Sequence, residues 1–113
     1  MKIVNLTRSI ILVEHARIAA SFWRRLTGLL FTKSLPNGQG LIIKRCKSVH
    51  TFGMTYTIDI IFVDALNTVI KIAEGVKPGR ISICSGGCFV IEAPEGTIAR
   101  TGTKKGDKLG MLS

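Results

Sequence analysis

The sequence predicts a mainly β domain of the α+β class. We expect a small antiparallel β-sandwich or barrel-like fold, jelly-roll-like in form, with one short helix near residues 21–28. Short β-branched runs recur with a turn signal about every eight to twelve residues, which favours a sandwich or barrel over an alternating α/β sheet. The 12 glycines lie mainly in these turns. A chain of 113 residues is long enough to bury one hydrophobic core, so we expect residues 1–113 to form a single domain.

The first expected elements are a hairpin and the helix. Residues 2–6 and 10–15 are short, partly β-branched runs with a tight connection between them, and the second run extends to Ile18. In the helix at residues 21–28, Ser21 caps the amino end, and Gly28 stands where a helix commonly ends.

Loops and strands alternate through the rest of the chain. Pro36, Asn37 and Gly38 predict a loop at residues 34–40. A turn at residues 64–67 joins its flanking runs as a hairpin, and residues 94–96 form a later turn. The strands expected here are 41–44, part of 48–52, 58–63, 68–73, 88–93, 97–101 and 108–112.

The charge is basic and unevenly distributed. The chain has 16 Lys and Arg against 7 Asp and Glu, a net charge of +9. Residues 1–50 hold nine basic residues and one acidic residue, whereas residues 51–113 hold seven and six. A positive field attracts nucleic acid, anionic lipid headgroups or acidic protein surfaces, although a basic balance also serves solubility alone.

The lengths of the apolar runs and the number of cysteines indicate the cellular compartment of the protein. No apolar run reaches the roughly 20 residues of a membrane helix, and Glu14 and His15 interrupt the first run, so we expect no transmembrane segment and no signal peptide. Three cysteines are too few for a disulfide framework. We therefore expect a cytoplasmic protein with reduced thiols. Cys84 and Cys88 lack a second pair of ligands, so we interpret them as thiols beside a turn and expect no metal and no cofactor.

The polar candidates gather in residues 46–64, before and inside the most apolar strand. His50 is the candidate for acid–base work, because only imidazole changes charge near neutral pH without tuning. Asp59 interrupts the apolar strand, and Glu92 interrupts a later one, so either carboxylate is a candidate to orient His50. The candidates for binding in the segment are Cys46, Ser48, His50, Thr51, Met54 and Asp59.

The same carboxylates have a structural interpretation, which we favour for Asp59. A buried carboxylate must be hydrogen-bonded, so Asp59 is expected to accept hydrogen bonds from His50, Thr51 or nearby backbone amides and to hold residues 50–57 in place. Turn geometry with side-chain-to-backbone bonding explains Asp107. The sequence contains no GxSxG nucleophile elbow, phosphate-binding loop or dinucleotide fingerprint, so no reaction class is indicated.

The whole pattern resembles the prokaryotic family called domain of unknown function 192, or uncharacterised protein family 0127. The combination of three motifs is specific to it: His-Thr-x-x-Met at residues 50–54, Ile-Asp-x-x-Phe at 58–62 and a late Gly-Asp at 106–107. The resemblance implies a small, mainly β, sandwich-like domain with one short helix, and no established activity. Many members look exported, whereas no leader is expected here. The matching residues are Phe22, Arg25, Leu26, Gly28, Leu29, Leu30, Gly40, Cys46, Ser48, His50, Thr51, Met54, Ile58, Asp59, Phe62, Asp64, Val69, Glu92, Gly96, Gly106 and Asp107.

Three functions are compatible with these features. The first is a non-enzymatic binding or accessory module whose basic half meets an anionic partner, either nucleic acid or an acidic protein surface. The second is an enzyme of undetermined class that uses His50 with Asp59 or Glu92. The third is a structural subunit that acts by assembly. The basic residues expected to contact an anionic partner are Arg24, Arg25, Lys44, Arg45 and Lys47.

Overall fold

The computed structural model of the protein describes residues 1–19, 35–44, 48–51 and 54–113. The predicted helix at residues 21–28 lies outside these residues. Ten strands and one short helix are formed within them. In chain order they are β1 (Lys2–Asn5), β2 (Ile10–Val13), β3 (His15–Ala19), β4 (Gln39–Lys44), β5 (Ser48–His50), β6 (Ile58–Val63), β7 (Val69–Val76), β8 (Ile81–Ile83), β9 (Phe89–Pro94), α2 (Thr97–Thr101) and β10 (Leu109–Leu112).

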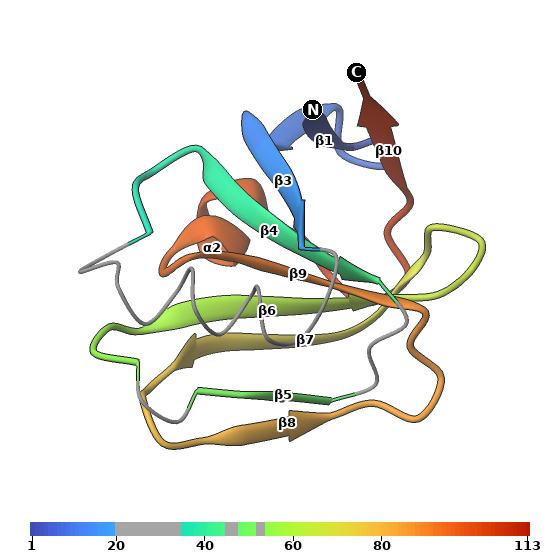
Figure 1. Cartoon of the computed structure of the whole chain (residues 1–113). Helices are drawn as coiled ribbons and strands as arrows, with labels where there is room; N and C mark the ends of the chain where they lie inside the picture. Colours follow the sequence, from blue (N-terminus) through green and yellow to red (C-terminus); the bar gives the residue numbers. More distant parts are fainter. Residues whose placement is uncertain (20–34, 45–47, 52–53) are drawn as a thin grey trace.

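A five-stranded sheet with the order β3-β4-β9-β6-β7 forms the middle of the molecule (Figure 1). All six residues of β6 are buried, because elements cover both faces of the sheet at this strand. The pairs β4–β9, β9–β6 and β6–β7 are antiparallel, as predicted. The pair β3–β4 is parallel, so the sheet is mixed.

One face of the five-stranded sheet packs against α2 and a second sheet with the order β10-β1-β2. Apolar residues from both sheets interdigitate between the two layers, as in a sandwich. The fully buried residues of this first core include Ile3, Leu12, Val13, Ile61, Val63, Val69, Ile91 and Ala93.

A two-stranded ribbon of β5 and β8 covers the opposite face, and Figure 1 shows it below β7. Val49 of β5 enters a second core between this ribbon and the five-stranded sheet. The buried residues of the second core are Leu41, Ile43, Val49, Met54, Ile58, Ile60, Phe62 and Val90. The fold is therefore a small β-rich sandwich, as predicted.

Local sequence signals placed most strands correctly. The strand predicted at residues 58–63 is β6, and the hairpins β1–β2 and β6–β7 are both confirmed. The short strand β8 carries no signal strong enough to be predicted. Its residues Ile81 and Ile83 are exposed, and it is only three residues long.

The predicted strand at residues 97–101 is wrong, because these residues form the helix α2. The β-branched Thr97 and Ile98 favour a strand locally. Two glycines override them: Gly96 and Gly102 bound the helix with φ angles of +92° and +69°, which end a strand and suit helix termini. Tertiary contacts then fix the helix, since its buried Ile98 packs into the first core.

Candidate functional site

Asp59 of β6 is buried and binds two backbone amides. Its Oδ1 accepts a hydrogen bond from the N–H of Gly75 at 2.9 Å, and its Oδ2 accepts one from the N–H of Ile98 at 2.9 Å. Opposite Asp59, β7 contains one extra residue, and Gly75 there has a φ of +60°. Ile98 lies in the first turn of α2, so the carboxylate caps this helix. The expected hydrogen bonding of Asp59 to backbone amides is confirmed, but the donors belong to β7 and α2, so these two bonds tie those elements to β6 and not residues 50–57.

Thr51 anchors the connection between β7 and β8. Its hydroxyl donates to the carbonyl of Lys77 at 2.7 Å and accepts from the N–H of Arg80 at 2.9 Å. Its backbone N–H donates to the carbonyl of Arg80 at 2.9 Å, and its carbonyl accepts from Gly79 at 3.1 Å. Thr51 is fully buried, so these bonds satisfy its polar groups inside the protein.

The other candidates in residues 46–64 have different surroundings. Met54 is 6% exposed and packs into the second core. Ser48 and His50 are the end residues of β5, and their backbones pair in register with Ile83 and Ile81. The side chains of Ser48 and His50, and all of Cys46, lie outside the described part of the chain.

Asp59 and Glu92 point to opposite faces of the five-stranded sheet. In the β6–β9 pair, Asp59 is opposite Ala93, whereas Glu92 is opposite Ile60. Because neighbouring residues of a strand alternate between faces, Asp59 faces α2 and Glu92 faces the side covered by β5. The structure does not bring the two carboxylates together. A pairing of His50 with Glu92 stays a prediction.

Asp107 organises a second buried polar cluster, near the start of β10. Its carboxylate accepts hydrogen bonds from Asn5 Nδ2 at 2.9 Å, Arg8 Nε at 2.6 Å and the N–H of Lys104 at 3.0 Å. Burial raises the pKa of Asp107, but these hydrogen bonds and the Arg8 charge outweigh it and hold the pKa below its usual range. The bond from Lys104 is the side-chain-to-backbone bond expected for Asp107, and the bonds from Asn5 and Arg8, which were not expected, tie the loop before β10 to the β1–β2 turn.

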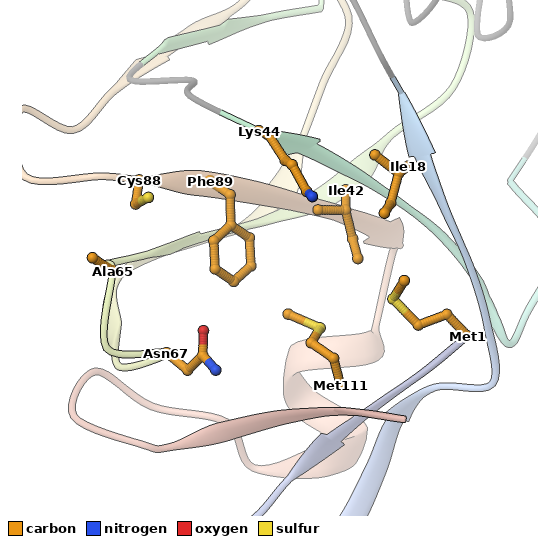
Figure 2. A pocket seen from close by; sticks show the side chains of 9 residues that line it. All are labelled: Met1, Ile18, Ile42, Lys44, Ala65, Asn67, Cys88, Phe89 and Met111. Carbon is orange, nitrogen blue, oxygen red and sulfur yellow. The ribbon is translucent and has the colours of Figure 1, made fainter. Parts of the chain in front are cut away.

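A cavity of about 470 Å³ opens between the five-stranded sheet and β10 (Figure 2). Its walls are mainly apolar, and three polar residues, Lys44, Asn67 and Cys88, complete the described lining. Figure 2 shows the Lys44 ammonium directed toward Ile42 and into the cavity. The apolar residues that line it are Met1, Ile18, Ile42, Ala65, Phe89 and Met111.

Among the described residues, Lys44 is the one predicted binding residue in the lining of this cavity. It is exposed at the end of β4 and is followed in the sequence by Arg45 and Lys47. The other predicted basic contacts, Arg24, Arg25, Arg45 and Lys47, lie outside the described residues.

The sequence of one protein family matches nearly the whole chain. A profile of domain of unknown function 192, described as "Uncharacterized ACR", matches residues 4–111. The chain belongs to this family. A UPF0127 protein from Pyrococcus horikoshii is 33% identical to the chain over 95% of its length and 96% of its own. A UPF0127 protein from Thermococcus sibiricus is 28% identical over 95% of the chain and 72% of its own length.

Two solved structures share the fold of this DUF192 chain. A protein of unknown function from Novosphingobium aromaticivorans superposes with a TM-score of 0.79 at 24% identity, over 97% of this chain and 82% of its own. A Sinorhizobium meliloti 1021 protein, suggested to be a transcription regulator, also has a TM-score of 0.79, at 19% identity, over 96% and 89% of the two chains. At these identities the likeness concerns the fold.

Most of the residues that line the cavity of this DUF192 chain were not predicted from the sequence as binding residues. Its lining comes from residues that are distant in sequence, from Met1 to Met111. Apolar strand residues that line a cavity follow the same alternation as those that fill a core, so no local signal separates them. Cys84 and Cys88 are confirmed as free thiols beside a turn; Cys84 packs against the second core, whereas Cys88 borders the cavity.

Two further findings concern metal ions and membranes. Among the described residues, no three His, Cys, Asp or Glu side chains are grouped in a way that could hold a metal ion. The helical residues of the described part include no segment long and apolar enough to cross a membrane.

Proposed function

We propose that this DUF192 domain is a non-catalytic binding or accessory module that meets an anionic partner through its basic surface. The main support for this proposal is the burial of several acidic residues. Three of the seven carboxylates, Asp59, Glu92 and Asp107, are buried, with exposures of 1%, 0% and 4%. Few carboxylates therefore remain at the surface to balance the basic residues there.

The basic N-terminal half has little internal compensation. Glu14, the one acidic residue among residues 1–50, lies 3.9 Å from Lys2. Arg17 of β3 and Lys44 of the neighbouring β4 are exposed, and neither forms an ion pair with a carboxylate in the described part of the chain. An anionic partner would supply the missing counter-charge.

The surface of the C-terminal half is also more basic than its residue count indicates. Residues 51–113 contain seven basic and six acidic residues, but all three buried carboxylates belong to this half. Basic side chains remain exposed there, among them Lys77, Arg80, Arg100, Lys104 and Lys105. The basic surface therefore extends beyond the N-terminal half.

The bonding of Asp59, a candidate for catalysis, and of Thr51, a candidate for binding, supports a non-catalytic role. Both carboxylate oxygens of Asp59 bind backbone amides, and the Thr51 hydroxyl both donates to and accepts from the backbone. Groups engaged in this way stabilise the fold. Recruiting either one for a reaction would require breaking buried hydrogen bonds.

Polyanion binding at two ionic strengths tests the proposal. Fluorescence anisotropy with a labelled oligothymidylate, at 50 and 200 mM salt, measures the affinity and its salt dependence. If the protein neutralises about three phosphates, the affinity falls about twentyfold between the two salt concentrations because counterion release loses its advantage. Polyglutamate as a competitor separates nucleic acid from an acidic protein surface as the preferred partner.

Charge-removing variants localise the contact. We expect Arg17→Gln, which removes an exposed charge from β3 outside the cavity lining, to weaken binding and to reduce the salt slope by about 0.7. The matched control, Lys77→Gln, removes one exposed charge from the C-terminal half and is expected to have a smaller effect. Absence of binding to either polyanion at both salt concentrations would refute the proposal. A stable oligomer by light scattering, together with that absence, would favour a role in assembly.

A further inference from the structure

We propose that the cavity beside Lys44 is a binding site for a small amphipathic carboxylate, an apolar chain or ring that carries one acid group. This inference goes beyond the proposed function, because it concerns a small-molecule site between the two layers of the fold. A polyanion is too wide to enter such a site, so the two proposals succeed or fail separately.

The size and position of the cavity suit a small ligand. Its volume of about 470 Å³ lies within the range of about 300–1,000 Å³ that is common for ligand sites. Residues of β3, β4, β9 and β10 line it, so among the described residues part of the apolar sheet face borders the space between the five-stranded sheet and β10 (Figure 2).

The walls favour an apolar group. Phe89 and Ile42 belong to the sheet face that forms the first core, and both also line the cavity. Ile18 and Met1, at the mouth, remain 44% and 43% exposed. A ligand that covers these side chains removes apolar surface from water, which is favourable. Methionine side chains such as Met1 and Met111 adapt readily to ligands of different shape.

The positive charge of Lys44 favours a ligand with a negative charge. The Lys44 ammonium points into a mainly apolar space, and none of the described lining residues is acidic. A cation beside apolar walls gains most from an anionic partner, and a charge-assisted hydrogen bond to a carboxylate is stronger than a neutral one. The Asn67 carboxamide, across the cavity, offers a further polar contact.

The three methionines make the test specific. Met1 and Met111 line the cavity, whereas Met54 is buried in the second core, on the other side of the five-stranded sheet. In protein labelled with ¹³C at the methionine methyl groups, titration with octanoate should shift the Met1 and Met111 signals with saturation and leave the Met54 signal in place.

Matched ligands and variants test the role of the charge. Octanoate, octanol and octylamine share one tail and differ in the head group, and we expect octanoate to bind about tenfold more tightly than octanol, with octylamine weakest. Lys44→Met keeps the length and the apolar stem but removes the charge, so it should abolish the preference for octanoate. Lys77→Met, beyond the far end of β7, is the control and should preserve it.

A cavity-filling variant tests the location. Ala65 is exposed at the rim, so Ala65→Trp can fill the cavity without entering the core, and it should weaken the binding of both octanoate and octanol. Three results would each overturn the inference: no shift of the Met1 and Met111 methyl signals, an equal shift of Met54, or equal affinity for octanoate and octanol in the unmodified protein.

Discussion

Replacing Asp59 with asparagine tests whether this carboxylate holds three elements of the fold together. Asp59 lies on β6, and its two oxygens bind Gly75 of β7 and Ile98 of α2, each at 2.9 Å. An asparagine side chain is nearly the same size as aspartate, but it has one acceptor oxygen and one amide group that can only donate. In Asp59→Asn, one of the two backbone amides therefore meets another donor in a buried site.

The expected loss of stability follows from the number of unsatisfied donors. A buried donor without a partner costs about 1–3 kcal/mol, and the remaining bond is weakened because its acceptor is no longer charged. We therefore expect Asp59→Asn to lower the free energy of unfolding by about 2–3 kcal/mol. Asp59→Ala leaves both amides without a partner and should lower it by about 3–5 kcal/mol, a large share of the 5–15 kcal/mol typical of a domain.

Urea unfolding followed by far-ultraviolet circular dichroism measures these losses, and Asp64→Asn is the matched control. Asp64 directly follows β6 and also accepts two backbone N–H bonds at 2.9 Å, from Leu66 and Thr68. Both of these bonds end on Oδ1, an atom that asparagine retains, so Asp64→Asn should cost less than about 0.5 kcal/mol, the usual range for surface changes.

Hydrogen exchange locates the effect. In Asp59→Asn, the amides of Gly75 and Ile98 should lose protection before the rest of their elements, since they are the two donors. An Asp59→Asn protein as stable as the Asp64→Asn control, with both amides still protected, would refute the capping role of Asp59.

Three further changes test other contacts. Because the pKa of Asp107 is lowered by folding, its stabilising contribution is complete above the ordinary value of 3.8 and is lost as the pH falls through the lower folded value. The urea midpoints of Asp107→Asn and the unmodified protein should therefore differ at neutral pH and converge in acid; a constant difference would contradict this. Thr51→Val removes the hydroxyl bonds to the β7–β8 connection and should speed tryptic cleavage after Arg80, whereas Thr51→Ser should not. Gly40→Ala would place a Cβ 3.1 Å from the backbone oxygen of Glu92, so we expect a loss of about 1–3 kcal/mol in thermal or urea unfolding, and an unchanged stability would show that the strands can separate freely.

Most strands could be predicted because β-branched residues mark each strand and turn residues mark where it ends. Alternating or continuous β-branched residues mark β6 and β7, and the turn residues between them set the hairpin. The helix α2 escaped prediction because Thr97 and Ile98 have strand propensity, and one of the hydrogen bonds to the first turn of the helix comes from Asp59, far away in the sequence.

The candidate site was predicted less completely, for a similar reason. The sequence indicated that a carboxylate inside an apolar strand must be hydrogen-bonded, and Asp59 is. It also indicated Lys44 as a binding residue, from its charge. The faces toward which Asp59 and Glu92 point depend on strand pairing, and a shift of one residue in register exchanges the faces.

The sequence by itself determined the β-rich class, the position of most strands, the excess of basic residues and the need of Asp59 for donors. Each of these depends on residue type and on neighbours close in the chain. Only the tertiary structure decided which amides bind Asp59, that three carboxylates leave the surface, and that Lys44 borders a cavity. These features join residues separated by tens of positions, and packing between the two layers brings such residues together.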